Sequence, residues 1–149
     1  MSEKFELTNA KAELVDGAEM LVDLTTAATS YCSLVPATDA DRKTLYNAVN
    51  SPAGKLADYI GKQITVTDVY VEIVDMMNQE TGEVTKAPRI VLFDKDGNSY
   101  GAVSTGVFGS LKKLFAVFGT PDTWKHPLKL EVKQIERGGG KRLLTLIAV

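Results

Sequence analysis

The chain has few of the residues that carry most catalytic and metal chemistry. Its 149 residues include one cysteine, Cys32, and one histidine, His126. A single thiol excludes an intrachain disulfide, and without a CxxC pair or a Cys/His cluster the sequence offers neither a zinc site nor a redox motif. His126 precedes a proline in an expected loop, where a lone imidazole is far more often a surface residue than a general base. We therefore expect no enzyme, no catalytic or metal site and no cofactor.

Long apolar runs are also missing. No hydrophobic stretch approaches the ~18 residues of a membrane span, and the first residues carry acids where a secretory signal carries bases. Hydrophobic residues make up 44% of the chain and charged residues 24%, which is typical of globular proteins and argues against disorder. The sequence predicts a protein in a reducing, intracellular compartment, with no membrane partner and a length suited to one domain.

Charge is divided between the two parts of the chain. Residues 1–85 hold six Lys or Arg against fourteen Asp or Glu, whereas residues 86–149 hold eleven against five. A cation-rich segment forms an electrostatic footprint for nucleic acid if its side chains share one face of the fold. Interspersed surface charge is the commoner explanation of such counts. The charge pattern alone therefore leaves both readings open.

The first 60 residues differ in pattern from the rest. Short apolar stretches at 5–7, 20–24 and 31–35 predict strands, and Thr38 is a helix N-cap for a helix that stops before Pro52. A shorter helical turn is expected from Pro52 to Ile60. Gly61 is the expected boundary, because every later element is short, alternating and bounded by turn residues. The pattern predicts a mixed α/β N-terminal extension over residues 1–60, which packs on a mostly β unit over residues 61–149 or makes subunit contacts.

The first strand after this boundary changes phase. In residues 63–78 the apolar side chains up to Val66 have one parity, and those from Val69 onward have the other. Strict alternation would send half of them to solvent, whereas one extra residue near Thr67 would bring both sets to one face. The sequence predicts one long, bent strand with a bulge at this point.

A hairpin signal follows a polar loop over residues 79–87. Asp96-Gly97 lies between two apolar runs and is typical of a two-residue turn. That turn places Phe93 opposite Tyr100, with Arg89 on the same face and the aliphatic side chains on the other. The aliphatic face is predicted to be the core, so the Arg89 face is predicted to meet solvent or a ligand. The alternative is that the acidic N-terminal segment covers this face as a second small core.

The last third of the chain predicts a helix and a second hairpin. Ser104 or Thr105 caps a helix whose apolar stripe, from Val107 to Phe118, is expected to be core, and Gly119 ends it. An alternating strand then places Lys129 and Lys133 outside, and the glycines at 138–140 turn it into a final strand. The expected register pairs Val132 with Leu146 and Leu130 with Ala148, with Arg137, Lys141 and Arg142 at the tip.

The order of these elements is that of a known fold. A long bent strand, two strands, a helix and two strands form the oligonucleotide-binding (OB) fold, a five-stranded barrel with one helix between strands three and four. In that fold the outer face of strands two and three, and the loops joining strands one to two and four to five, contact nucleic acid or sugar. Aromatic rings beside cations suit sequence-tolerant binding of single strands.

A longer motif runs through the same region: Ala87-Pro88-Arg89-Ile90-Val91-Leu92-Phe93-Asp94, Gly97, Ser99-Tyr100, Ala102-Val103-Ser104, Gly106, Ser110-Leu111-Lys112-Lys113, Phe118-Gly119 and Pro121. With residues 60–62 and 69–72, it resembles single-stranded DNA-binding proteins of tailed bacteriophages, of the type found in phages of Gram-positive hosts, over roughly residues 45–149. The resemblance implies single-stranded DNA as partner, a role in phage replication or recombination, and the cytoplasm of the infected host as location. Phage replication or recombination proteins and further copies of the chain are candidate partners.

Three groups of candidate nucleic-acid-binding residues follow. The expected stacking platform is Arg89, Phe93 and Tyr100, with Tyr70 and Trp124 as secondary rings. A buried tyrosine with a bonded hydroxyl and a tryptophan packed under a loop are equally good explanations of these two secondary rings. The expected phosphate contacts are Lys86, Lys129, Lys133, Arg137, Lys141 and Arg142. The alternative function is an OB-fold protein-interaction module in a phage assembly or replisome complex, with the acidic half docking a basic partner.

Overall fold

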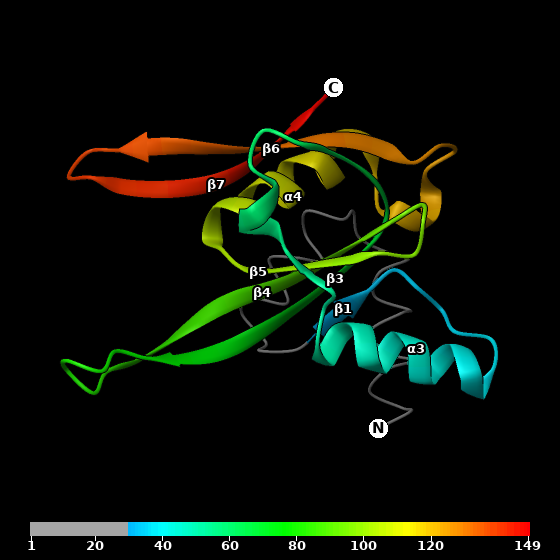
Figure 1. The fold of residues 1–149 in the computed structure, drawn as a ribbon, viewed down its shortest axis with the longest axis horizontal. Coiled ribbons are helices and arrows are strands. Elements are labelled where there is room, and N and C mark those ends of the chain that lie inside the picture. The colour runs from blue at the N-terminus through cyan, green and yellow to red at the C-terminus, as the bar shows by residue number, and fades with distance from the viewer. Residues whose placement is uncertain (1–29) are drawn as a thin grey trace.

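Residues 30–149 are described by a computed structural model, and they fold around one curled β-sheet (Figure 1). The strand order is β2-β5-β4-β3-β6-β7, and β1 pairs with β3. The strands are β1 (Ser30–Cys32), β2 (Gly54–Lys55), β3 (Gln63–Met77), β4 (Val84–Asp94), β5 (Ser99–Val103), β6 (Leu128–Arg137) and β7 (Lys141–Ala148). The helices are α3 (Asp39–Asn50) and α4 (Thr105–Phe118), with 3₁₀ turns at η1 (Leu56–Tyr59) and η2 (Pro121–Thr123). The protein is mostly β, and the sheet curls into a half-barrel.

Of the three strands expected in the N-terminal segment, one lies among the described residues. The strands expected at 5–7 and 20–24 lie outside the described residues. The strand expected at 31–35 is the short β1, which pairs with the second half of β3. Within residues 30–149, neither helix is long and apolar enough to cross a membrane.

The bulge in β3 is confirmed. Its pairing with β4 shifts register between Val66 and Asp68, leaving Thr67 as the extra residue. As a result Val66 and Val69, which have opposite parity in the sequence, are both fully buried in one core. The bend also divides the strand between partners, because residues 63–66 pair with β6 and residues 70–72 pair with β1. One strand therefore joins both parts of the half-barrel.

The predicted register of the β4–β5 hairpin is wrong by one residue. Phe93 pairs with Ser99, and Leu92 pairs with Tyr100. The turn has three residues between Asp94 and Asn98, with Gly97 in the left-handed region at φ 83°. The Asp94 carboxylate stabilises this wider turn by accepting hydrogen bonds from the backbone N–H groups at positions 96 and 98. The extra turn residue sends Tyr100 to the core face, away from Phe93.

Helix α4 covers the core and the free edge of β7. Ser104 is its N-cap, accepting a hydrogen bond from the Val107 N–H at 3.1 Å. The expected stripe is buried as far as Phe115, whereas Phe118 at the last turn is 45% exposed and lies outside the core. Ser110 accepts a hydrogen bond from the Leu146 N–H of β7. Helix and strand edge therefore contact each other directly.

Gly106 has a packing role that the sequence did not indicate. A Cβ at this position would lie 2.1 Å from the Leu144 carbonyl oxygen and 2.6 Å from the Leu143 Cγ. Glycine normally weakens the first turns of a helix, by about 1 kcal/mol relative to alanine. Here it lets α4 approach the β7 backbone more closely than any other residue would.

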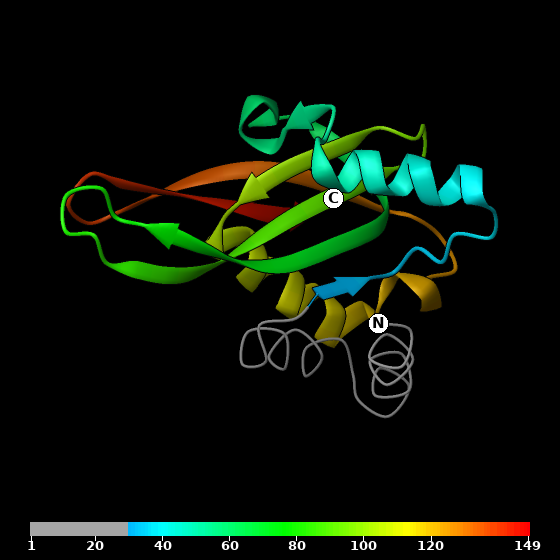
Figure 2. The same ribbon diagram turned by 90° about the horizontal axis from the view of Figure 1, so that it is seen from below.

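Two hairpins extend beyond the half-barrel toward the same side (Figures 1 and 2). β3 and β4 pair out to Met77 and Val84, so β4 begins before Pro88 and residues 84–87 of the loop expected at 79–87 are strand. β6 and β7 pair out to residues 137 and 141, in the predicted register. We refer to residues 74–87 as the β3–β4 arm and to residues 133–145 as the β6–β7 arm.

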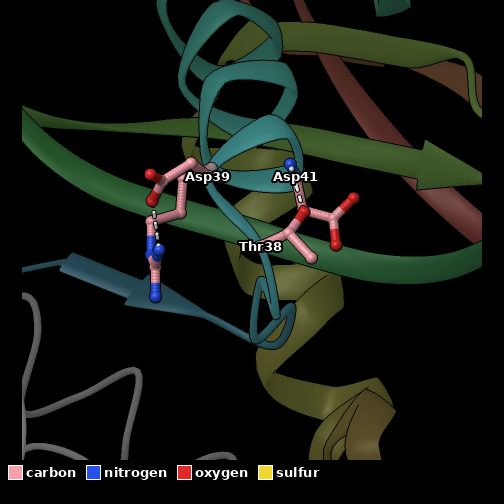
Figure 3. Close-up of polar contacts among 4 residues, drawn as sticks. Thr38, Asp39 and Asp41 are labelled. Carbon is pink, nitrogen blue, oxygen red and sulfur yellow. Dashed lines mark hydrogen bonds and ion pairs between the residues drawn. The ribbon is translucent and has the colours of Figure 1, made fainter.

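Helix α3 lies on the opposite side of the sheet from α4 (Figure 2). Thr38 caps it as predicted, its hydroxyl accepting a hydrogen bond from the Asp41 N–H at 3.1 Å (Figure 3). Asp39 and Arg42 form an exposed ion pair on the first turn. No residue of α3 is buried. The helix is therefore held by its ends and by light contact with the sheet.

Candidate nucleic-acid interface

The outer face of β3 and β4 carries three of the candidate residues. The core side chains of these strands, such as Val71 and Ile90, point toward α4, so their neighbours point outward. Tyr70 pairs with Val91, and Glu72 with Arg89. Phe93 follows on the same face. The structure therefore places Tyr70, Arg89 and Phe93 on one face, as predicted for the last two, and Tyr100 on the other.

A hydrogen-bonded chain runs across this face. The Arg89 guanidinium contacts Glu72 Oε1 at 2.9 Å, and the Tyr70 hydroxyl donates to Glu72 Oε2 at 3.1 Å. The side chains of Arg89 and Glu72 are only 21% and 31% exposed. Burial, then the charge and hydrogen bond of Glu72, raise the pKa of Tyr70 to about 12. Arg89 is thus matched by a carboxylate and is not a free cation.

Helix α3 lies across the outer face of β3 and β4, and two cavities lie between the helix and this face. The first cavity, of about 430 Å³, lies between Tyr46, Val49 and Asn50 of α3 and the chain formed by Tyr70, Glu72 and Arg89. We call it the tyrosine cleft. Its α3 residues are not among the candidates from the sequence, because the helical spacing of Tyr46 and Val49 indicates only the apolar side of a helix. The arrangement combines two tyrosines with polar groups that donate and accept hydrogen bonds.

The second cavity explains why Phe93 is not an open platform. It has a volume of about 320 Å³ and is lined by Phe93 together with Pro36, Leu45, Ala48 and other residues of the segment before and within α3. Phe93 is 8% exposed. The alternative stated above, that the N-terminal segment covers this face, therefore holds for Phe93.

Tyr100 and Trp124 are packed rings. Tyr100 is 8% exposed, meets Tyr59 edge to face at 4.8 Å and donates its hydroxyl to Asp94 at 2.7 Å. Burial and the Asp94 carboxylate raise the pKa of Tyr100 to about 12. Trp124 packs against Phe115, and its ring N–H donates to the Gly119 carbonyl at 2.8 Å. Both rings have the contacts expected of structural aromatics.

The candidate cations lie mainly on β6 and β7. Residues 128–148 hold five cations and two anions. Lys129, Lys133 and Arg142 are exposed, and Lys133 contacts Glu131 at 3.1 Å. The backbones of residues 137 and 141 close the hairpin, while the side chains of Arg137 and Lys141 lie outside the described part of the structure. This hairpin is the cationic region of the fold.

The β3–β4 arm has the opposite character. Its residues 74–87 hold three acids and one cation, Lys86. Lys86 contacts Asp75 at 3.1 Å, and both side chains are more than half exposed. An exposed pair of this kind contributes little in water, but it leaves the arm without excess positive charge. The two arms therefore carry net charges of opposite sign.

The one cysteine and the one histidine of the chain lie on different elements. Cys32 lies half-buried in β1, and burial raises the pKa of its thiol, which lowers its reactivity. His126 is exposed in the loop before β6. Among the described residues, no group of three or more His, Cys, Asp or Glu side chains is placed to hold a metal ion.

Comparison with known proteins gives the family. A family model described as phage single-stranded DNA-binding protein matches residues 15–148. Neither the curated proteins nor the solved structures give a match. The matched range includes the whole half-barrel, α3 and both arms, and proteins of this family act by binding DNA. The chain belongs to the family of phage single-stranded DNA-binding proteins.

Proposed function

We propose that this protein covers unpaired DNA during phage replication or recombination, in the cytoplasm of the infected bacterium, with little dependence on base sequence. The role is binding without a chemical step. Family membership supports the partner, single-stranded DNA. Sequence tolerance follows if recognition uses phosphates and ring faces, which every nucleotide offers.

The observation that carries this mechanism is the cationic β6–β7 hairpin. Exposed Lys129 and Lys133 lie on one face of this two-stranded ribbon, and exposed Arg142, which pairs with Glu136 near the tip, lies on its other face. Basic side chains on such a ribbon can follow a flexible phosphate backbone. The acidic β3–β4 arm would repel the same backbone. We infer that the strand runs along β6 and β7 and that Lys86 contributes less than the sequence suggested.

The fold supports the same interpretation. Strands β3 to β7, with α4 between β5 and β6, follow the element order of an OB fold, in which the two arms correspond to the loops joining strands one to two and four to five. We propose an OB-type barrel over residues 61–149. Residues 30–60, the described part of the proposed extension, add β1 and β2 to the sheet and place α3 over its outer face.

A fluorescence titration with oligo(dT) at two salt concentrations tests the proposal. Binding should weaken with a log–log slope near −0.7 for each phosphate neutralised. Arg142→Ala should lower affinity and flatten that slope by about one unit or less, whereas Lys86→Ala, at an exposed position on the other arm, should change both less. The signal is the fluorescence of a dye on the oligonucleotide, because the Trp124 ring is packed against Phe115. No binding at low salt, as for a protein-interaction module, would overturn the proposal, and equal effects of the two variants would overturn the assignment to β6 and β7.

A further inference from the structure

The tyrosine cleft has the size and lining of a small-molecule site. Its volume of about 430 Å³ falls within the range of roughly 300–1,000 Å³ typical of ligand pockets. One wall is α3, with Tyr46, Val49 and Asn50, and the other is the sheet. Tyr46 is 67% exposed, although an aromatic ring on a helix facing a sheet would normally pack against it. The helix thus holds an aromatic ring beside an open space.

The charges in the cleft favour a neutral ligand. Arg89 and Glu72 neutralise each other at 2.9 Å, so the cleft has no surplus cation to hold a phosphate. Its polar atoms are nevertheless of both kinds, because the Asn50 amide donates and accepts, Glu72 accepts and Arg89 donates. The Tyr70 phenol is neutral at physiological pH, and burial raises its pKa further above that range. A flat, uncharged group with hydrogen-bonding edges matches this lining.

Building on the function proposed above, we propose that the tyrosine cleft is a subsite for one unpaired nucleobase, and that Tyr46 of α3 is a stacking residue of the DNA site. The base enters between α3 and the outer face of β3 and β4, next to Tyr70, while the phosphates on either side remain in solvent. Helix α3 then acts as the outer wall of a base-binding site. This gives α3 a role that its exposed position otherwise lacks, since none of its residues is buried.

The test uses the full chain, oligo(dT) and matched variants on α3. Tyr46→Ala should weaken binding about 5- to 100-fold, the range expected for loss of one stacked base. Tyr46→Phe should bind as the wild type does, because stacking needs the ring and not the hydroxyl. Asn47→Ala is the control, because Asn47 is exposed on the same helix and lines neither cavity.

A second measurement locates the base directly. Oligonucleotides carrying 5-iododeoxyuridine should photocross-link to peptides that contain residue 46 or 70, as identified by mass spectrometry. Unchanged affinity of Tyr46→Ala beside normal wild-type binding, or cross-links only to β6 and β7, would overturn this inference and leave the proposed function standing. Equal losses for the alanine and phenylalanine variants would overturn stacking as the cause. If the wild-type chain fails to bind oligo(dT) at all, the proposed function fails first.

Discussion

The close contact between Gly106 of α4 and the edge of β7 predicts that Gly106→Ala destabilises the protein. Helix propensity alone predicts the opposite, that the substitution stabilises it. In an isolated helix, Gly→Ala stabilises by about 0.5–1 kcal/mol, because alanine loses less backbone entropy. At Gly106 the new methyl would lie 2.1 Å from a backbone oxygen and 2.6 Å from a leucine side chain, so either α4 or β7 must move. Overpacking of a core costs about 1–3 kcal/mol, and a backbone obstacle relaxes less than a side chain. We expect Gly106→Ala to lower the free energy of unfolding by at least about 1–2 kcal/mol.

Gly109 supplies the matched control on the same helix. A Cβ there meets no atom within 4 Å, so Gly109→Ala should stabilise by up to about 1 kcal/mol and raise the melting temperature by roughly 2–4 °C. Urea unfolding followed by circular dichroism measures both variants, with equal m values showing that the unfolded state is unchanged. A Gly106→Ala variant as stable as the wild type would show that α4 does not lie against β7 as described.

Three further predictions concern the sheet. Tyr100→Ala should destabilise the fold by on the order of 3 kcal/mol in urea titrations, since the ring is 8% exposed in the core; a loss of DNA affinity with unchanged stability would contradict this. The raised pKa of Tyr70, about 12, means that the unfolded chain ionises first. The contribution of Tyr70 to stability is therefore full below pH 10 and is lost from there toward pH 12. Between about pH 9 and pH 11, unfolding curves should show a larger loss of stability for the wild type than for Tyr70→Phe, in which Tyr100 still titrates but residue 70 does not. Deletion of Thr67 should turn one set of buried β3 side chains to solvent, at about 1.5–3 kcal/mol for each valine exposed, and a deletion variant with wild-type melting would refute the bulge.

Sequence patterns predicted the fold where periodicity and caps acted together. The phase change around Thr67, the caps at Thr38 and Ser104 and the register of β6 with β7 each depend on local chemistry that a single sequence shows. The β4–β5 register failed because a two-residue and a three-residue turn share the Asp-Gly signal. The choice between them rests on hydrogen bonds to the Asp94 carboxylate, which the spacing does not reveal.

The candidate site was only partly predicted, because part of it depends on local alternation and the rest on contacts between segments far apart in the sequence. Placing Arg89 and Phe93 on the outer face needed only alternation within β4, and it is confirmed. The cover provided by α3 depends on where a segment far away in sequence docks, and no periodicity encodes that. The match between Arg89 and Glu72 likewise depends on which strands pair.

Other parts of the chain lie on three of the strand edges of the half-barrel. β1 lies on the second half of β3, β2 on β5, and α4 on β7, where Ser110 takes up the Leu146 N–H. Pro88, just beyond the end of the β4–β5 pairing, offers no N–H to a visiting strand. Exposed edges recruit other sheets, and the hazard grows with local concentration. Where copies of this DNA-binding protein lie close together, covered edges of this kind reduce pairing between their sheets.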